Sequence, residues 1–235
     1  MFDQVGRRLM ARIVFDLDGT LIDSAADIHA LANIVLAEEG AAPLTLAQTR
    51  TFVGNGAPMF VTRMRAARGL PESDHDRLLA RFVAGYSSAV DLTEVFAGVE
   101  DALATLRAGG HRLGICTNKP LAPAQAVLDH TGLAQYFDAV IGGDSLPTVK
   151  PDPAPLDAAF AALGTGPKVF VGDSDVDADA AVQAQVPFLL FAHGYARKPL
   201  AELPCDATFD SFDALPALIT KVIAAAQPES AAPAP

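Results

Sequence analysis

The sequence predicts an α/β protein in which a mostly parallel β-sheet is covered by helices on both faces and carries a small helical insert. Short apolar runs alternate with helical patterns from residue 96 onward, as expected for successive βαβ units. Residues 43–90 hold helical patterns and no strand pattern. Apolar residues make up 51% of the 235 positions, enough to bury a sizeable core.

The first strand and the first helix are expected near the N-terminus. Residues 12–16 form an apolar run that ends in Asp16, which is typical of a buried strand carrying an acid at its carboxyl end. From Asp23 onward apolar positions recur with helical spacing, Asp23 or Ser24 can cap the helix, and Gly40 ends it. The first helix is therefore expected to follow the first strand after a short connection.

A breaker at residues 53–58 divides the helical insert. After the insert we expect strands at 112–116, 139–141, 168–171 and 187–191, and helices at 99–108, 123–130, 153–163, from 175, and 212–225. The predicted organisation is a core of residues 11–23 and 95–225, a helical cap of residues 24–94 and a disordered tail of residues 226–235.

Composition and charge exclude several classes of protein. The net charge of -11 argues against a nucleic-acid partner, because such proteins need a basic excess. No apolar run reaches the length of a membrane span, and residues 1–12 lack the apolar segment of a secretory signal. Cys116 and Cys205 lack metal-ligand spacing, and we expect no structural disulfide between them. The absence of a disulfide favours a reducing, cytoplasmic location. We expect a monomer or homodimer.

Four polar clusters each follow a separate predicted strand: residues 16–20, 117–118, 150–151 and 172–177. The carboxyl ends of parallel strands lie at one edge of a sheet, so carboxylates, a lysine and small donors should converge there. Any one cluster alone is typical of a turn or a helix cap, and Asp175 and Asp179 favour cap or surface roles. All four in this order predict a catalytic site.

The chemistry of these residue types indicates phosphoryl transfer. Converging carboxylates need a cation, and oxygen ligands with room for water suit Mg²⁺. Lys150, Thr117 and Asn118 could then bind phosphoryl oxygens of a small phosphate ester. Asp16 could attack phosphorus while Asp18 exchanges protons with the leaving group and with water, although spacing alone would allow the reverse.

The four clusters resemble motifs I to IV of the haloacid dehalogenase superfamily over nearly the whole chain, from Arg12 to about Leu218. The resemblance implies a Rossmann-like, doubly wound core with a helical cap inserted after motif I. It implies Asp16 as nucleophile and Asp18 as general acid and base. The remaining implied roles are phosphate contacts by Thr117, Asn118 and Lys150, Mg²⁺ on the carboxylates of Asp16 and Asp173 and the main-chain oxygen of Asp18, and support from Asp177 and Ser174.

Within the superfamily, residues 15–24, 53–58 and 142–144 and the segment 191–195 resemble phosphoglycolate phosphatases, which implies hydrolysis of 2-phosphoglycolate. The alternatives are a phosphatase for a sugar phosphate or a cell-wall precursor, a sugar phosphomutase, and a binding protein on a former enzyme scaffold. Gln185 departs from the family's Ala-Gly pattern, which predicts an unfavourable backbone angle there.

Substrate choice is expected to lie in the cap. The loop residues Gly54, Asn55 and Gly56 either close over the substrate or form a plain turn between helices. Three cap arginines could meet a substrate carboxylate or could equally face solvent: Arg63, Arg65 and Arg68.

Overall fold

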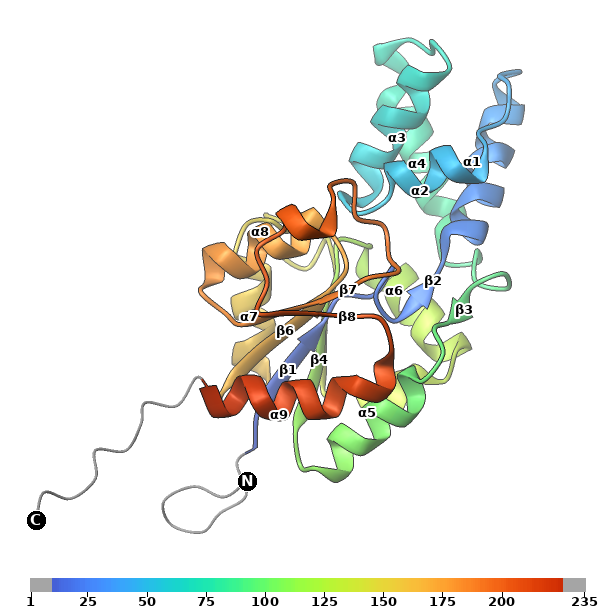
Figure 1. The fold of residues 1–235 in the computed structure, drawn as a ribbon. Coiled ribbons are helices and arrows are strands. Elements are labelled where there is room, and N and C mark those ends of the chain that lie inside the picture. Colours follow the sequence, from blue (N-terminus) through green and yellow to red (C-terminus); the bar gives the residue numbers. More distant parts are fainter. Residues whose placement is uncertain (1–9, 226–235) are drawn as a thin grey trace, which may run out of the picture.

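The computed structural model describes residues 10–225, which form a sheet-containing core and a group of helices above it (Figure 1). The sheet of the described chain has six strands in the order β5-β4-β1-β6-β7-β8, and every neighbouring pair is parallel. The predicted tail, residues 226–235, lies outside the described residues. The predicted fold class is confirmed.

The strands are β1 (Arg12–Phe15), β2 (Ile22–Asp23), β3 (Glu94–Val95), β4 (Arg112–Cys116), β5 (Ala139–Ile141), β6 (Lys168–Gly172), β7 (Phe188–Phe191) and β8 (Ala207–Phe209). The helices are α1 (Ala25–Glu38), α2 (Leu46–Phe52), α3 (Gly56–Ala67), α4 (His75–Tyr86), α5 (Val99–Ala108), α6 (Leu121–His130), α7 (Ala154–Ala162), α8 (Asp175–Ala184) and α9 (Leu215–Ala225).

Alternation along the central strand β1 divides the core into two apolar layers. Ile13 and Phe15 pack with α5, α6 and α9 on one face of the sheet, whereas Val14 packs with α7 and α8 on the other. These side chains are fully buried, because a strand with helices on both faces has no solvent-facing side. The two-faced burial holds the carboxyl ends of the strands in fixed register.

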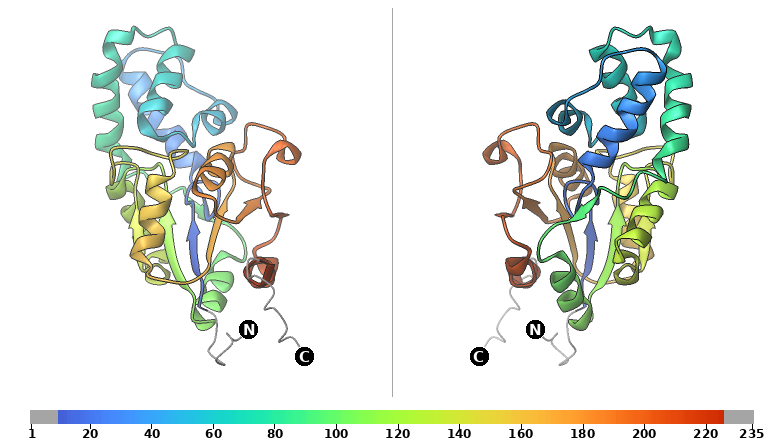
Figure 2. Two further views of the ribbon diagram at one scale, coloured as in Figure 1. Left: turned by 90° about the vertical axis from the view of Figure 1, so that its left-hand side faces the viewer. Right: turned by 90° about the vertical axis from the view of Figure 1, so that its right-hand side faces the viewer.

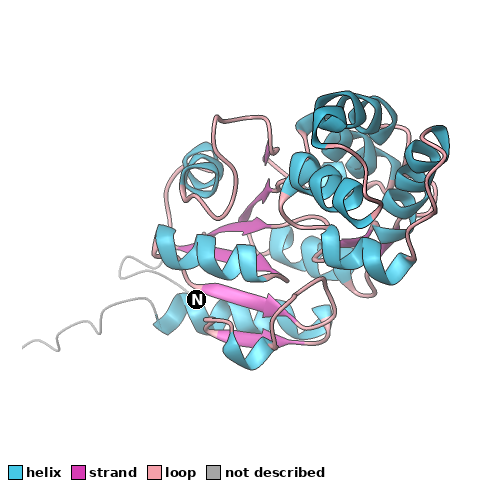
Figure 3. Cartoon of the chain, turned by 90° about the horizontal axis from the view of Figure 1, so that it is seen from above, coloured by secondary structure: helices cyan, strands magenta, loops and turns pink. Residues whose placement is uncertain are grey.

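Helices α1 to α4 form a separate apolar cluster, in which Phe60 stacks on Phe82 and Tyr86 packs against Phe82 at a tilt. The strands and this helical cap form distinct groups in the side views and from above (Figures 2 and 3). The predicted absence of strands between residues 43 and 90 is confirmed, since the segment holds α2, α3, a short 3₁₀ turn and α4.

Two elements were not expected from the sequence. The short antiparallel ladder of β2 and β3 pairs Ile22 with Val95 and Asp23 with Glu94, at the two places where the chain passes between core and cap. Strand β8 adds a sixth strand at the sheet edge. Both are too short for an apolar period to reveal, so pairing with a neighbouring strand decides their conformation.

The expected strain at Gln185 is present. This residue ends α8 in the left-handed conformation, with φ 52° and ψ 47°, and it is the only non-glycine residue with positive φ among those described. None of the described helices has the length and apolar character needed to cross a membrane.

Candidate active site

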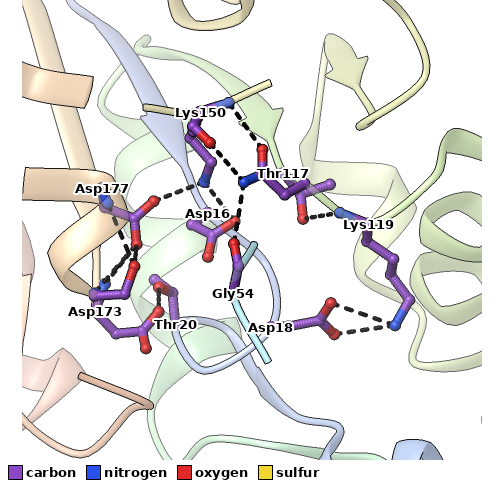
Figure 4. A network of polar contacts seen from close by, with 11 residues as sticks. Asp16, Asp18, Thr20, Gly54, Thr117, Lys119, Lys150, Asp173 and Asp177 are labelled. Atoms are coloured by element: carbon purple, nitrogen blue, oxygen red, sulfur yellow. Dashed lines mark hydrogen bonds and ion pairs between the residues drawn. The ribbon is translucent and has the colours of Figure 1, made fainter. Parts of the chain in front are cut away.

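Three carboxylates meet at the carboxyl edge of the sheet, just beyond β1 and β6 (Figure 4). Asp16 follows β1 directly, Asp173 follows β6, and Asp177 stands in the first turn of α8. All three are buried, and each offers an oxygen within 4.8 Å of the others. The parallel sheet thus assembles acids that lie more than 150 positions apart in the sequence.

Lys150 is the cation of this cluster. Its Nζ lies 2.8 Å from Asp16 Oδ1 and 2.6 Å from Asp177 Oδ1, and its side chain is 2% exposed. Burial lowers the pKa of this lysine, but the two carboxylates raise it by more, so its pKa lies above the ordinary value. Lys150 therefore keeps its charge beside Asp16.

Asp173 has hydrogen-bond donors around it, and it forms no ion pair with any residue between 10 and 225. Its Oδ1 accepts from the Thr20 hydroxyl at 2.7 Å, and its Oδ2 accepts from the Tyr195 backbone N–H at 2.6 Å. Gly19 and Gly194 press against the same carboxylate, and a Cβ at either position would overlap it. The surrounding backbone therefore fixes the direction in which Asp173 points.

Packing three acids against one lysine leaves an excess of negative charge in a site with little water. Burial raises the pKa of Asp16 to about 7, with Asp177 adding to the rise and Lys150 opposing it. Burial, Asp177 and Asp16 raise the pKa of Asp173 well above its ordinary value. A divalent cation would relieve this repulsion, and Asp16 and Asp173 are hard oxygen ligands, so the residues fit such an ion.

Asp177 has a structural task beside the cluster. Its Oδ2 accepts from the Ser174 hydroxyl at 2.6 Å and from two backbone N–H groups, and it forms a capping box with Ser174 at the start of α8. Asp175 instead bonds Arg197 at 2.6 Å, and Asp179 is exposed. Of the acids in this loop and helix, only Asp173 and Asp177 face the cluster.

Asp18 points away from the three acids, toward Lys119 (Figure 4). Lys119 Nζ lies 3.1 Å from Asp18 Oδ1 and 3.4 Å from Oδ2, and the Ser24 hydroxyl donates to Oδ1 at 2.5 Å. Ser24 was expected to cap α1, and it does occupy the N-cap position, but its side chain makes no cap hydrogen bond. It bonds the Asp18 carboxylate instead.

Asn118 ties two loops and the cap together. Its Nδ2 donates to the carbonyls of Gly54 and Lys150, at 3.0 and 2.9 Å, and its Oδ1 accepts from the Lys150 backbone N–H. Thr117 Oγ1 accepts from the Lys119 N–H at 3.1 Å and lines the same cleft. Both residues predicted to contact phosphate are thus at the site, with Asn118 also holding Lys150 in place.

A cleft with a cavity volume of about 30 Å³ opens above Asp16 and Asp18, between core and cap. The core contributes its polar floor, and the cap contributes mostly apolar walls together with the loop residues Gly54 and Gly56. The remaining lining residues are Ile28, Val53, Ala57, Phe60, Phe82, Tyr86, Thr117, Asn118 and Lys119. Such a concave site with a few converging polar groups suits a small ligand.

The cap loop is anchored to the core by Asn118 and by Arg197. Asn55 Oδ1 accepts from Arg197, which follows β7, and from Arg63 of the cap at 2.8 Å. Arg65 and Arg68 bond backbone carbonyls within the cap. None of the three cap arginines is among the residues that line the cleft.

Sequence reasoning missed four residues that hold the site: Thr20, Ser24, Lys119 and Tyr195. Thr20, Ser24 and Lys119 stand inside the recognised motifs, where their positions were the only available signal. Tyr195 stands in the glycine-tyrosine segment and bridges core and cap, because its hydroxyl donates to Asp23 at 2.7 Å and accepts from the Ala25 N–H of α1 at 3.2 Å. His193, by contrast, packs its ring against Phe191 beside the sheet.

Comparison with known proteins agrees with this architecture. Residues 13–191 match the family model of haloacid dehalogenase-like hydrolases, and the chain belongs to this family. The phosphoglycolate phosphatase of Cereibacter sphaeroides is 49% identical over 218 residues, which cover 92% of this chain and all of that protein. The phosphoglycolate phosphatase of Rhodobacter capsulatus is 44% identical, covering 88% of this chain and 95% of the relative.

A solved structure gives the same fold. The crystal structure of a predicted phosphoglycolate phosphatase from Haemophilus somnus 129pt superimposes with a TM-score of 0.83 at 30% identity. The match covers 89% of this chain and 98% of that one. The family, the core and the cap therefore agree between sequence and structure.

Proposed function

We propose that this protein is a Mg²⁺-dependent phosphatase that hydrolyses a small phosphate monoester, 2-phosphoglycolate above all, through a phosphorylated Asp16. The buried cluster of Asp16 and Asp173 at the floor of the cleft, with Asp18 beside it, carries the proposal. Relatives at up to 49% identity that are named phosphoglycolate phosphatase support the choice of substrate.

In the first step an oxygen of the Asp16 carboxylate attacks phosphorus, and the bond from phosphorus to the ester oxygen breaks. Asp18 gives its proton to the departing alkoxide, so that glycolate leaves as the alcohol. Lys150, 2.8 Å from Asp16, Thr117 and Asn118 stabilise the negative charge on the phosphoryl oxygens. The product of this step is an aspartyl-phosphate on Asp16.

In the second step a water molecule attacks the phosphorus of the aspartyl-phosphate. Asp18, now ionised, removes a proton from that water, and the acyl phosphate bond breaks to release inorganic phosphate and free Asp16. The Ser24 hydroxyl and the Lys119 ammonium hold Asp18 in one orientation for both proton transfers. Atoms and protons then balance over the two steps.

The metal would be held by the carboxylates of Asp16 and Asp173 and by the main-chain oxygen of Asp18. When bound, Mg²⁺ supplies positive charge that draws the phosphoryl group toward the acidic cluster. Ser174 and Asp177 orient this region through the capping box and through Lys150. The raised pKa values of Asp16 and Asp173 favour a site that awaits a cation.

We further propose that the protein works in two parts. Residues 11–23 and 95–225 would act as the catalytic core and residues 24–94 as the cap, moving about the β2–β3 ladder. The loop of Gly54, Asn55 and Gly56 would then close over the substrate. Its hydrogen bonds to Asn118 and Arg197 would hold it in the closed position. We expect a cytoplasmic monomer or homodimer, consistent with two free cysteines.

A phosphate-release screen over about thirty metabolites with Mg²⁺ tests the substrate. We expect 2-phosphoglycolate to be hydrolysed well above sugar phosphates and cell-wall precursors. Preferred release from another ester would favour a different phosphatase, and isomerisation without net release would favour a sugar phosphomutase. No turnover of any ester would make the protein a binding module.

Two variants test the assigned roles in the same screen. Asp16→Asn should abolish turnover, and Asp173→Asn should lower it more than 100-fold and raise the Mg²⁺ concentration needed for half-maximal rate. Asp179→Asn is the matched control, because this acid of α8 is exposed, and it should behave as wild type. Near-normal release by Asp16→Asn, or full activity in EDTA, would remove Asp16 or the metal from the mechanism.

A further inference from the structure

The cleft has one cationic side chain among the described residues that line it, and that is Lys119. Lys150 is not among those lining residues and is paired with Asp16 and Asp177. The cap arginines are engaged elsewhere, Arg63 with Asn55 and the other two with backbone carbonyls. Among the described lining residues, a second anionic group on the substrate therefore has Lys119 as its one cationic partner.

Lys119 is built into its position. Its side chain is 2% exposed, and its Nζ lies on the Asp18 carboxylate and 4.2 Å from the centre of the Tyr86 ring. An ammonium group has three N–H donors, and Asp18 is the one carboxylate within ion-pairing distance of Lys119 in the described structure. Its contacts run to both Asp18 oxygens, at 3.1 and 3.4 Å, and to the Tyr86 side chain, so an acceptor on the substrate would take over the longer contact, the one to Asp18 Oδ2.

The two ends of the site are separated in space (Figure 4). Asp173 and Asp177 lie on one side of Asp16, and Asp18 with Lys119 lies on the opposite side. In the proposed reaction the phosphoryl group stays on the Asp16 side while the ester oxygen faces Asp18. The organic part of the substrate must then extend from Asp18 along Lys119 and the cap walls.

The size of the organic part decides what meets Lys119. In 2-phosphoglycolate a single methylene carbon joins the ester oxygen to the carboxylate carbon. The distance from Asp18 Oδ1 to Lys119 Nζ is only 3.1 Å, so a group one carbon from the ester oxygen falls within reach of the ammonium. Of the other cap side chains that line the cleft, Phe60, Phe82 and Ile28 are apolar and offer a neutral hydroxyl no hydrogen bond.

We propose that Lys119 is the specificity-determining residue of this enzyme and binds a carboxylate carried one carbon from the ester oxygen of the substrate. The inference rests on the proposed phosphatase function and narrows its substrate to phosphorylated α-hydroxy acids. Tyr86 contributes a neutral surface beneath the ammonium, since burial raises the pKa of its hydroxyl to about 12. A buried ammonium group packed against a ring and a carboxylate binds a charged carboxylate much more strongly than a neutral group.

A pair of matched substrates tests the proposal. The rate constant kcat/KM is measured for 2-phosphoglycolate and for 2-hydroxyethyl phosphate, which replaces the carboxylate by a neutral alcohol of similar reach. The ratio of the two values cancels any effect of a variant on Asp18, because both substrates use the same acid. A purely structural role for Lys119 would change both values together and leave the ratio unchanged.

We expect the wild-type ratio to fall by about 10- to 100-fold in Lys119→Met, in line with a lost hydrogen bond to a charged group. The ratio should stay within about threefold of wild type in Lys119→Arg, which keeps the charge. Lys119→Gln, whose amide still donates to Asp18, replaces the Met variant if that variant does not fold. Arg63→Met is the control, because Arg63 does not line the cleft, and it should keep the ratio.

The outcomes separate the two proposals. Wild-type enzyme that prefers 2-phosphoglycolate while Lys119→Met or Lys119→Gln keeps the full ratio would overturn the role of Lys119 and leave the phosphatase function intact. Wild-type enzyme that hydrolyses other esters but not 2-phosphoglycolate would overturn the proposed substrate, and the role of Lys119 with it. A collapse of the ratio only in the neutral variants supports both.

Discussion

Neutralising Asp16 should stabilise the metal-free protein while it destroys catalysis. Asp16 lies in a buried cluster with Asp173 and Asp177, and Lys150 balances only part of their charge. The pKa of Asp16 is raised by burial from 3.8 to about 7. The folded protein therefore holds the Asp16 proton more tightly than the unfolded chain does, so the ionised form strains the fold.

The magnitude follows from linkage between protonation and folding. Because the folded-state pKa is the higher one, the stability associated with Asp16 is complete below about pH 3.8 and is lost as the pH rises to about 7. At about 1.4 kcal/mol for each pH unit, this interval corresponds to about 4 kcal/mol of unfolding free energy. Asp16→Asn resembles the protonated acid at every pH and escapes the loss, while its amide oxygen can still accept from Lys150.

Urea unfolding in EDTA measures this difference. We expect Asp16→Asn to exceed wild type in unfolding free energy by about 4 kcal/mol at pH 8 and by less than about 2 kcal/mol at pH 5. Added Mg²⁺ should narrow the gap at pH 8, because it binds only the wild-type cluster tightly. Asp179→Asn, an exposed acid, should show no such pH dependence. A variant that is no more stable than wild type at pH 8, or a gap independent of pH, would refute the reasoning.

Two further predictions concern the backbone. Gly194→Ala should lower phosphate release more than tenfold and raise the Mg²⁺ requirement, because its Cβ would overlap the Asp173 carboxylate; unchanged Mg²⁺ half-saturation would contradict this. Gln185→Gly should raise the unfolding free energy by about 1 kcal/mol in urea, because glycine adopts the left-handed conformation at φ 52° without strain; it should leave turnover unchanged, and a loss of stability would contradict the argument.

The periodicity of apolar residues was sufficient to predict most strands and helices of the core. The strands at 112–116 and 139–141 match β4 and β5 residue for residue, and a parallel sheet requires their ends to share an edge. That rule predicts that Asp16 and Asp173 lie close together, and they do lie within one cluster. Strong local patterns, together with the rule for parallel sheets, were therefore sufficient to predict where these two acids lie.

The supporting residues depended on side-chain directions that no pattern encodes. Ser24 has the sequence signature of a helix cap, yet its hydroxyl bonds Asp18, because the turn after β1 brings that carboxylate closer than the helix N–H groups. Lys119 has no sequence signal beyond its place after Asn118, yet it is buried under the cap against Tyr86. Contacts between core and cap decided both.

The sequence by itself determined the fold class and the acids and lysine at the strand ends, because these depend on local periodicity and on the geometry common to all parallel sheets. The family followed from the resemblance of the four clusters to known motifs. Only the tertiary structure decided that Asp18 pairs with Lys119, that Asn55 joins Arg197, and that the cap arginines lie outside the cleft lining. Those contacts depend on how the cap packs on the core, where residues distant in sequence meet and one residue's preference cannot predict its partner.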